Sequence, residues 1–306
     1  MAATTWVDIR TPPRRGEPLG LVAGYAGAVI EVADLDRAVG FYRRLLGVGQ
    51  PSAESEGLRL QLDSGQSLTL TRKSEPRTFP ETAIHRALRI PHSRFTATIA
   101  ALEAMGVAVD RYHEDRDAEC AENYYCADPD GNRLQLVEAS ETGIDHAAVE
   151  TYDVEWSEVF YTQVLDARVE QRVGWTMDDF ARAWAWGRGE DACAPGARRW
   201  ETLYTDTRPR VPRPNAQLYF RLGPGVAFAV YLAPEHRQEP PPRVFRGTPR
   251  IAFRVPRGRL DELAERLRSI RLRCMWPSPT TGGPFERVDE ALYVRDPSGN
   301  FLEFRE

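Results

Sequence analysis

The sequence predicts an α+β protein built from two tandem copies of one module, and two repeated segments lead to that prediction. A segment that begins at Gly27, GAVIEVADLDRAVGFYRRLLGV, recurs from His146 as HAAVETYDVEWSEVFYTQVLDA. A second segment, YYCADPDGNRLQLVE from Tyr124, recurs from Leu292 as LYVRDPSGNFLEFRE. A pair of segments that opens and closes each half in the same way indicates a duplicated structural unit.

The opening segment is typical of a strand that runs into a helix. Its first part alternates between apolar and polar residues, and Asp34 then stands where a helix N-cap is expected. After this aspartate, apolar residues follow helical spacing, namely Ala38, Phe41, Tyr42, Leu45 and Leu46. The copy from His146 keeps an acid seven residues in, at Asp153, and the same Phe-Tyr pair.

The closing segments are predicted to be hairpins. At 128–132 and 296–300 both carry Asp-Pro-x-Gly-Asn, which supplies a fixed proline φ, an Asp side chain to hold the turn and a glycine for a left-handed position. Between opening and closing, further strand-helix units begin near Ala83 and Pro249. The chain therefore contains four strand-helix units.

Composition excludes two classes of partner. The 306-residue chain is long enough for two ordinary domains, and its net charge of −5 provides no basic surface for nucleic acid. No apolar run is long enough to span a membrane, and the N-terminus lacks the pattern of a signal peptide. We expect a cytoplasmic protein, a monomer or homodimer, whose partner is a small molecule.

The repeated motifs resemble those of the vicinal-oxygen-chelate superfamily, which includes glyoxalases, extradiol dioxygenases, fosfomycin-resistance enzymes and bleomycin-binding proteins. The opening V-x-D-L-x-x-A-x-x-F-Y-x-x-L-L-G is complete at 32–47, and both D-P-x-G-N turns are present. The resemblance covers nearly all of 25–306. It implies four βαβββ motifs that form two curled, partly open mixed-sheet barrels.

The resemblance also suggests how the chain is divided. Residues 1–24 are expected to be a tail, 25–140 a first module with a degenerate metal site, and 141–306 a second module with the functional cavity. The second module is longer, and its extra residues fall near 172–215.

This insert carries four of the seven tryptophans, so it is either a lid over the cavity or a segment whose rings pack against the barrel. Five residues are predicted to bind substrate: Glu150, Trp175, Trp184, Trp186 and Tyr231.

In the family, metal ligands come from the first strand of each unit and from the strand after each D-P-x-G-N turn. The corresponding strand starts hold Gly27, His85, His146 and Arg250. The closing strands hold Gln135 and Glu303.

If units three and four pair, the second module offers His146, Arg250 and Glu303. Arginine keeps its proton and cannot bind a metal, so we expect an Arg250–Glu303 ion pair and no metal, or otherwise a metal held by His146 and Glu303 alone. Tyr293 lies ten residues before Glu303, where extradiol dioxygenases keep an active-site tyrosine. The acid/base histidines of that family are missing, which argues against iron-dependent ring cleavage.

If units two and three pair instead, His85, Gln135 and His146 come together and could hold iron, manganese, nickel or zinc. The sequence does not choose between these pairings. Under the first pairing, replacing Gln135 with alanine should change little.

The function indicated is an enzyme that acts on a small aromatic or secondary-metabolite-like molecule at an altered, metal-free site. His146 would act as a base or lone ligand, and Arg250, Tyr293 and Glu303 would complete the catalytic group. One alternative is a metal-free binder that sequesters a toxic compound, as bleomycin-resistance proteins do. Another is a divalent-metal-dependent dioxygenase or lyase.

Overall fold

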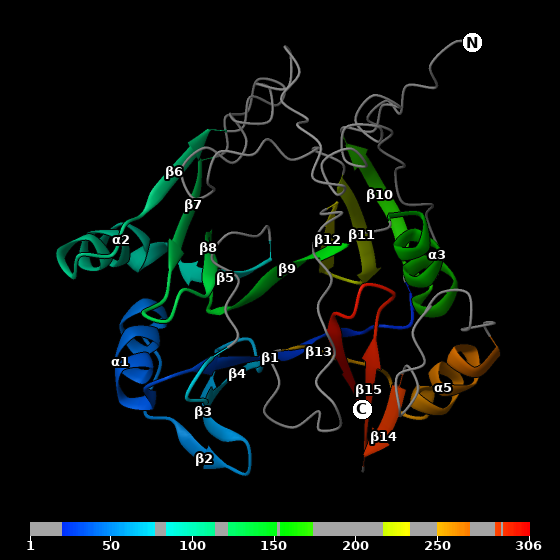
Figure 1. Cartoon of the computed structure of the whole chain (residues 1–306). Coiled ribbons are helices and arrows are strands. Elements are labelled where there is room, and N and C mark those ends of the chain that lie inside the picture. Colours follow the sequence, from blue (N-terminus) through cyan, green and yellow to red (C-terminus); the bar gives the residue numbers. More distant parts are fainter. Residues whose placement is uncertain are drawn as a thin grey trace.

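The computed structural model describes residues 20–76, 84–113, 122–151, 154–173, 217–232, 250–269, 285–288 and 290–306. These residues form two eight-stranded mixed sheets with helices packed against them (Figure 1). The predicted α+β class and its four strand-helix units are therefore confirmed. In the described part of the chain, no helix combines the length and the hydropathy needed to cross a membrane.

Each unit contains a strand, a helix and three further strands. Unit one consists of β1 (Gly24–Val32), α1 (Leu35–Leu46), β2 (Ser52–Glu54), β3 (Gly57–Gln61) and β4 (Ser67–Arg72). Unit two consists of β5 (His85–Pro91), the short helix η1 (His92–Arg94), α2 (Phe95–Ala104), β6 (Asp110–His113), β7 (Glu122–Ala127) and β8 (Arg133–Ala139). Unit three consists of β9 (Gly143–Thr151), α3 (Val154–Leu165), β10 (Arg168–Val173), β11 (Gln217–Gly223) and β12 (Val226–Leu232). Unit four consists of β13 (Arg250–Arg254), α5 (Arg259–Ser269), β14 (Phe285–Val288), β15 (Ala291–Arg295) and β16 (Phe301–Arg305).

The first helix shows how the local sequence produces these elements. The Asp34 side chain accepts a hydrogen bond from the backbone N–H of Arg37 at 3.0 Å, and Gly47 ends the helix in the left-handed conformation. The buried residues of α1 are the five apolar positions predicted from helical spacing.

The two sheets do not coincide with the two halves of the chain. Sheet A has the strand order β14-β15-β16-β13-β1-β4-β3-β2, so it joins units one and four. Sheet B has the order β10-β11-β12-β9-β5-β8-β7-β6, so it joins units two and three. Antiparallel pairs of first strands, β1 with β13 and β5 with β9, form the centre of each sheet. Of the two pairings left open by the sequence, the structure has units two and three together.

Hydrogen bonds around the first D-P-x-G-N turn connect sheet B to sheet A. The Asp128 carboxylate accepts from the backbone N–H groups of Asp130 and Asn132 and from the hydroxyl of Tyr42 on α1, the last at 2.9 Å. Nδ2 of Asn132 donates to the same carboxylate and to the carbonyl of Glu31 on β1. The hairpin belongs to unit two and its partners to unit one. We call this group the first turn clamp.

The second turn repeats this arrangement in the opposite direction. Asp296 accepts from the backbone N–H groups of Ser298 and Asn300 and, at 2.8 Å, from the hydroxyl of Tyr161 on α3. Nδ2 of Asn300 donates to Asp296 and to the carbonyl of Glu150 on β9. This second turn clamp joins a hairpin of sheet A to unit three in sheet B.

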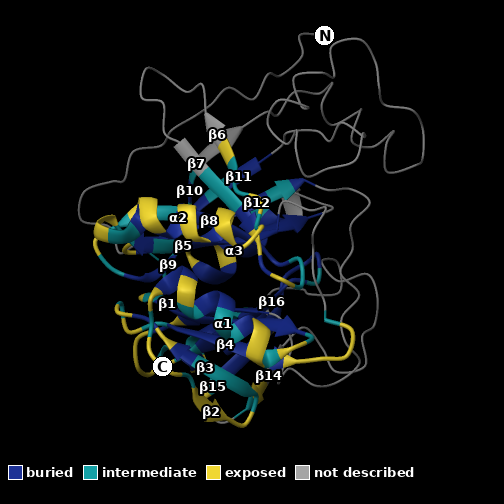
Figure 2. Ribbon diagram, turned by 90° about the vertical axis from the view of Figure 1, so that its left-hand side faces the viewer, coloured by how far each residue is buried: buried dark blue, intermediate teal, exposed yellow. Residues whose placement is uncertain are grey.

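A continuous hydrophobic core lies between the helices and the sheets, where Figure 2 shows the buried residues. Tyr25 of β1 crosses from sheet A to sheet B, and its hydroxyl accepts from the backbone N–H of Ala147 and donates to the carbonyl of Ala227. On α3, the ring of Tyr161 packs 5.1 Å from the rings of Phe220 and Phe228. Side chains alternate along a strand, so neighbours of these phenylalanines point to the face of sheet B opposite α3.

Burial of Asp296 should make stability depend on pH. Burial raises the pKa of its carboxyl from 3.8 to about 6, against the opposing effect of its hydrogen bonds. Between these values the folded protein binds a proton more readily than the unfolded chain, so this group lowers stability as pH rises from about 4 to about 6, by on the order of 3 kcal/mol. Urea denaturation across this range should show that decrease in wild type and lose it in Asp296→Asn. Asp261→Asn, which changes an exposed carboxylate, should keep the wild-type profile, and an unchanged slope in Asp296→Asn would contradict the assignment.

Candidate functional site

The centre of sheet B brings His85, Gln135 and His146 together. In the antiparallel pair β5–β9, His85 lies opposite Ala148 and Ala87 lies opposite His146, while β8 places Gln135 beside Ala87. Paired residues of neighbouring strands point to the same side of a sheet. Nε2 of His146 lies 3.4 Å from Nε2 of His85 and 2.9 Å from Oε1 of Gln135. We call this side of sheet B the histidine face.

Asp145 determines how the ring of His146 is oriented. Its Oδ2 lies 2.7 Å from Nδ1 of His146, and this hydrogen bond lowers the pKa of the Asp145 carboxyl more than burial raises it. An ionised carboxylate only accepts, so Nδ1 carries a proton. In the tautomer whose other ring nitrogen is unprotonated, the lone pair of Nε2 points to the place where His85 Nε2 and the Gln135 amide oxygen also meet.

These three atoms fit part of a coordination shell. Neighbouring ligands of a cation bound at about 2.0–2.2 Å lie about 3.0 Å apart in octahedral geometry and about 3.4 Å apart in tetrahedral geometry. The separations of 2.9 Å and 3.4 Å fall in this range. Among the described residues, no group of three or more His, Cys, Asp or Glu side chains could hold a metal. The present donors differ from such a group because one of them is an amide.

The strand that would supply a fourth donor carries alanine instead. β12 lies beside β9 as β8 lies beside β5, and Ala229 pairs with Ala148 as Gln135 pairs with Ala87. A methyl group offers no lone pair, so Ala229 cannot act as a ligand.

Tyrosines surround the histidines on the same face. The ring of His85 lies 5.6 Å from that of Tyr125 and 6.3 Å from that of Tyr231. The hydroxyl of Tyr219 donates to Oε1 of Gln217 at 2.5 Å and lies 3.4 Å from the hydroxyl of Tyr231. Flat rings with hydroxyl groups suit a planar molecule that carries oxygen atoms.

Glu150 adds a buried carboxyl group to this face. It lies two residues beyond Ala148, pairs with Tyr231 across β9 and β12, and is 2% exposed. The predicted substrate-binding residues Glu150 and Tyr231 thus share the histidine face. Trp175, Trp184 and Trp186, with nearly all of the predicted insert, lie outside the described residues.

Sheet A has an ion cluster at the equivalent place. Nε of Arg250 lies 2.5 Å from Oε2 of Glu303, and its Nη2 lies 2.6 Å from Oε2 of Glu56. Its guanidinium lies 5.2 Å from the ring centroid of Tyr293, and Arg305 also pairs with Glu303. Burial by itself would lower the pKa of Arg250, but the charges of Glu303 and Glu56 outweigh it and raise the pKa.

The predicted Arg250–Glu303 pair is therefore confirmed, whereas its expected association with His146 is wrong. Unit four pairs with unit one, so Arg250, Tyr293 and Glu303 lie in sheet A and His146 lies in sheet B. A cation site formed by His146 and Glu303 does not assemble in this structure. The alternative set of His85, Gln135 and His146 does assemble.

Three residues of these centres were missed by sequence reasoning. Glu56 reaches Arg250 from the turn between β2 and β3, and nothing in a Glu-Gly turn indicates that contact. Asp145 directly precedes His146, which was an available signal, since carboxylates commonly orient ligand histidines. Ala229 becomes significant only through its register with Ala148.

Comparison with known proteins agrees with the repeat analysis. Residues 27–137 match the family model of the glyoxalase-like domain. No curated protein sequence matches the chain.

Solved structures share the fold over nearly the whole chain. A putative dioxygenase from Bacillus subtilis subsp. subtilis str. 168 is similar with a TM-score of 0.57 and 13% identity, over 94% of this chain and 86% of that one. Glyoxalase I from Zea mays is similar with a TM-score of 0.56 and 11% identity, over 92% of each chain. At these identities, the likeness concerns the fold alone.

Placing a histidine at position 250 should create a cation site in sheet A. In Arg250→His, an imidazole would face the carboxylates of Glu56 and Glu303, which together are good ligands for a divalent ion. Calorimetric titration with Zn²⁺ in a His146→Ala background, which removes one of the three proposed sheet B donors, should show a new site of one equivalent.

Arg250→Met is the matched control, because it removes the same charge without adding a ligand. It should bind no ion in sheet A and should lose about 3–5 kcal/mol of unfolding free energy, since the buried carboxylate of Glu303 and the partly buried one of Glu56 lose their shared partner. If the folded histidine variant binds no more Zn²⁺ than the methionine variant, Arg250 does not occupy a latent ligand position.

Proposed function

This chain has the vicinal-oxygen-chelate fold, with a glyoxalase-like domain at residues 27–137, and on that premise we propose that it is an enzyme acting on a small molecule at the histidine face of sheet B. We further propose that His85, Gln135 and His146 hold a divalent cation there. The substrate is a small, oxygen-bearing molecule of aromatic or secondary-metabolite type.

The convergence of His85 Nε2, His146 Nε2 and Gln135 Oε1 carries this proposal. Asp145 keeps the His146 proton on Nδ1, so Nε2 faces the shared centre as an acceptor. Converging acceptors repel one another unless a proton or a cation lies between them. The side chain of His146 is 23% exposed, so a ligand can reach this centre from solvent.

The residues around the centre suit binding and proton handling. A bound divalent cation would polarise a substrate oxygen and make an attached hydroxyl or water more acidic. Tyr125 and Tyr231 flank His85 with rings for stacking, and the Tyr219 hydroxyl, which donates to Gln217, can accept a hydrogen bond from a substrate hydroxyl. Glu150 supplies a buried carboxyl group that can hold a proton.

A metal-free binder that sequesters its ligand is the second candidate. The alanine at 229 and the amide at 135 leave this face with fewer anionic donors than a tight metal site prefers. The three tyrosines by themselves would suit stacking of an aromatic compound.

Divalent-ion binding separates the two candidates. Purified protein reconstituted with Fe²⁺, Mn²⁺, Ni²⁺ or Zn²⁺ should bind one equivalent, and His85→Ala or His146→Ala should abolish it. Asp145→Asn should weaken binding by about 10- to 100-fold, because Nδ1 of His146 loses its carboxylate partner. His92→Ala changes an exposed histidine on η1 and should bind as wild type does. Wild-type protein that binds none of these ions would overturn the metal site and leave a metal-free enzyme or the sequestering protein, which differ in whether the bound molecule is chemically changed.

The identity of the side chain at 135 should tune the affinity. Gln135→Glu adds a negative charge to the donor set and should strengthen ion binding by about tenfold, whereas Gln135→Ala should weaken it by a similar factor. Both can be measured by competition with a fluorescent chelator. Equal affinity in all three proteins would place Gln135 outside the coordination shell and favour the sequence-based expectation that its loss changes little.

A further inference from the structure

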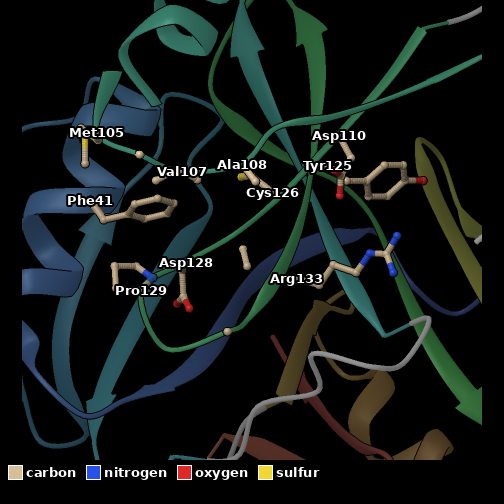
Figure 3. Close-up of a pocket in the computed structure, with 13 residues that line it drawn as sticks. Phe41, Met105, Val107, Ala108, Asp110, Tyr125, Cys126, Asp128, Pro129 and Arg133 are labelled. Carbon is tan, nitrogen blue, oxygen red and sulfur yellow. The ribbon is translucent and has the colours of Figure 1, made fainter. Parts of the chain in front are cut away.

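A cavity of about 470 Å³ lies between α1, the loop that follows α2, and the β7–β8 hairpin (Figure 3). Its apolar lining comprises Phe41, Met105, Val107, Ala108, Cys126 and Pro129. The cavity is open to solvent on one side, where Met105, Ala108 and Pro129 are exposed, and its floor is formed by the buried Phe41 and Cys126. It falls in the size range of small-molecule pockets.

The cavity is distinct from the histidine face. Figure 3 shows Phe41, Met105 and Val107 on one side of the hairpin, whereas the side chains of Tyr125 and Arg133 point to the other side. Tyr125 is the residue whose ring contacts His85. The hairpin therefore separates the two regions and forms a wall of each.

The lining favours a neutral ligand. The Asp128 carboxylate is already held by the first turn clamp. Burial raises the pKa of the Cys126 thiol to about 12, so it stays uncharged at neutral pH. Asp110 also borders the cavity, whereas the side chain of Arg133 points to the other side of the hairpin. Among the residues that line the cavity, no cationic side chain therefore points into it, and an anionic ligand would lose its hydration without gaining a charge partner.

Met105 makes one wall of the cavity adaptable. Its side chain is 39% exposed, and among the residues that the structure describes no other large hydrophobic residue is exposed. Its sulfur accepts a contact from Nη1 of Arg44 at 3.4 Å, and Gly106 beside it turns the chain with φ of +77°. An unbranched thioether can adjust to the shape of an apolar partner, as methionines do on binding surfaces.

We propose that this cavity is a second ligand site, which binds a flat, neutral, apolar molecule of about ten heavy atoms, the size of a bicyclic aromatic ring system. The occupant packs between Phe41 and Cys126, with Met105 at the mouth. Because the hairpin also carries Gln135 and Tyr125, an occupant stiffens the wall of the histidine face from behind.

Methionine methyl NMR tests this site directly, because the chain has only four methionines and Met105 lines the cavity. Indole, titrated into full-length protein labelled with [methyl-¹³C]methionine, should shift the Met105 methyl resonance upfield by ring current and saturate. Met105→Leu assigns that resonance. Indole-3-carboxylate has the same ring with a negative charge and should bind at least tenfold more weakly.

Ala108→Trp fills the cavity and should reduce indole affinity at least tenfold. Ala101→Trp places the same side chain on an exposed position of α2 outside the lining and should bind as wild type does. Intermolecular NOEs from indole to the Met105 methyl in wild type give the same answer if Ala108→Trp fails to fold.

The proposal would be overturned by any of three results. These are saturable binding that leaves the Met105 resonance unshifted, unchanged indole affinity in folded Ala108→Trp, and no binding of indole at all. Titration of the same samples with divalent ions tests the proposed metal site independently, since indole binding does not require ion binding and ion binding does not require indole binding.

Discussion

The hydrogen bonds that the turn carboxylates Asp128 and Asp296 accept are the connection on which the rest of the structure depends. Each carboxylate holds its own hairpin turn and also accepts from a tyrosine on the helix of the preceding unit. The matching asparagine reaches the first strand of that unit. Both aspartates are nearly or fully buried, so removing a donor would leave a carboxylate undersatisfied in a region that water does not reach.

These clamps hold the two units of each half together although the two units belong to different sheets. The two units of each half of the chain, one with two and three with four, meet through helices, core and clamp, which leaves their first strands to pair with a unit of the other half. The result is two sheets that each have an antiparallel pair of first strands at the centre. In sheet B this central pair brings together two histidines that are 61 residues apart in sequence.

The two sheets carry different polar groups at their centres. At the centre of sheet A, the guanidinium of Arg250 satisfies Glu303 and Glu56 from within the chain, so the charges there are already balanced. At the centre of sheet B, two imidazoles and an amide oxygen meet, and Asp145 orients His146. This contrast is why we propose that the chemistry belongs to sheet B, whereas sheet A holds an ion cluster.

The sequence by itself determined the local elements and the repeat. The Asp34 cap, the buried face of α1 and both D-P-x-G-N hairpins follow from near-neighbour effects, namely turn chemistry, capping and periodicity, and these survive in the folded chain. The Arg250–Glu303 pair was also predictable, because both residues belong to one unit. Only the tertiary structure decided which units pair, because first strands with similar patterns can form the same antiparallel ladder with either partner. That choice placed His146 with His85 and Gln135, and it placed Glu56 of unit one beside Arg250 of unit four.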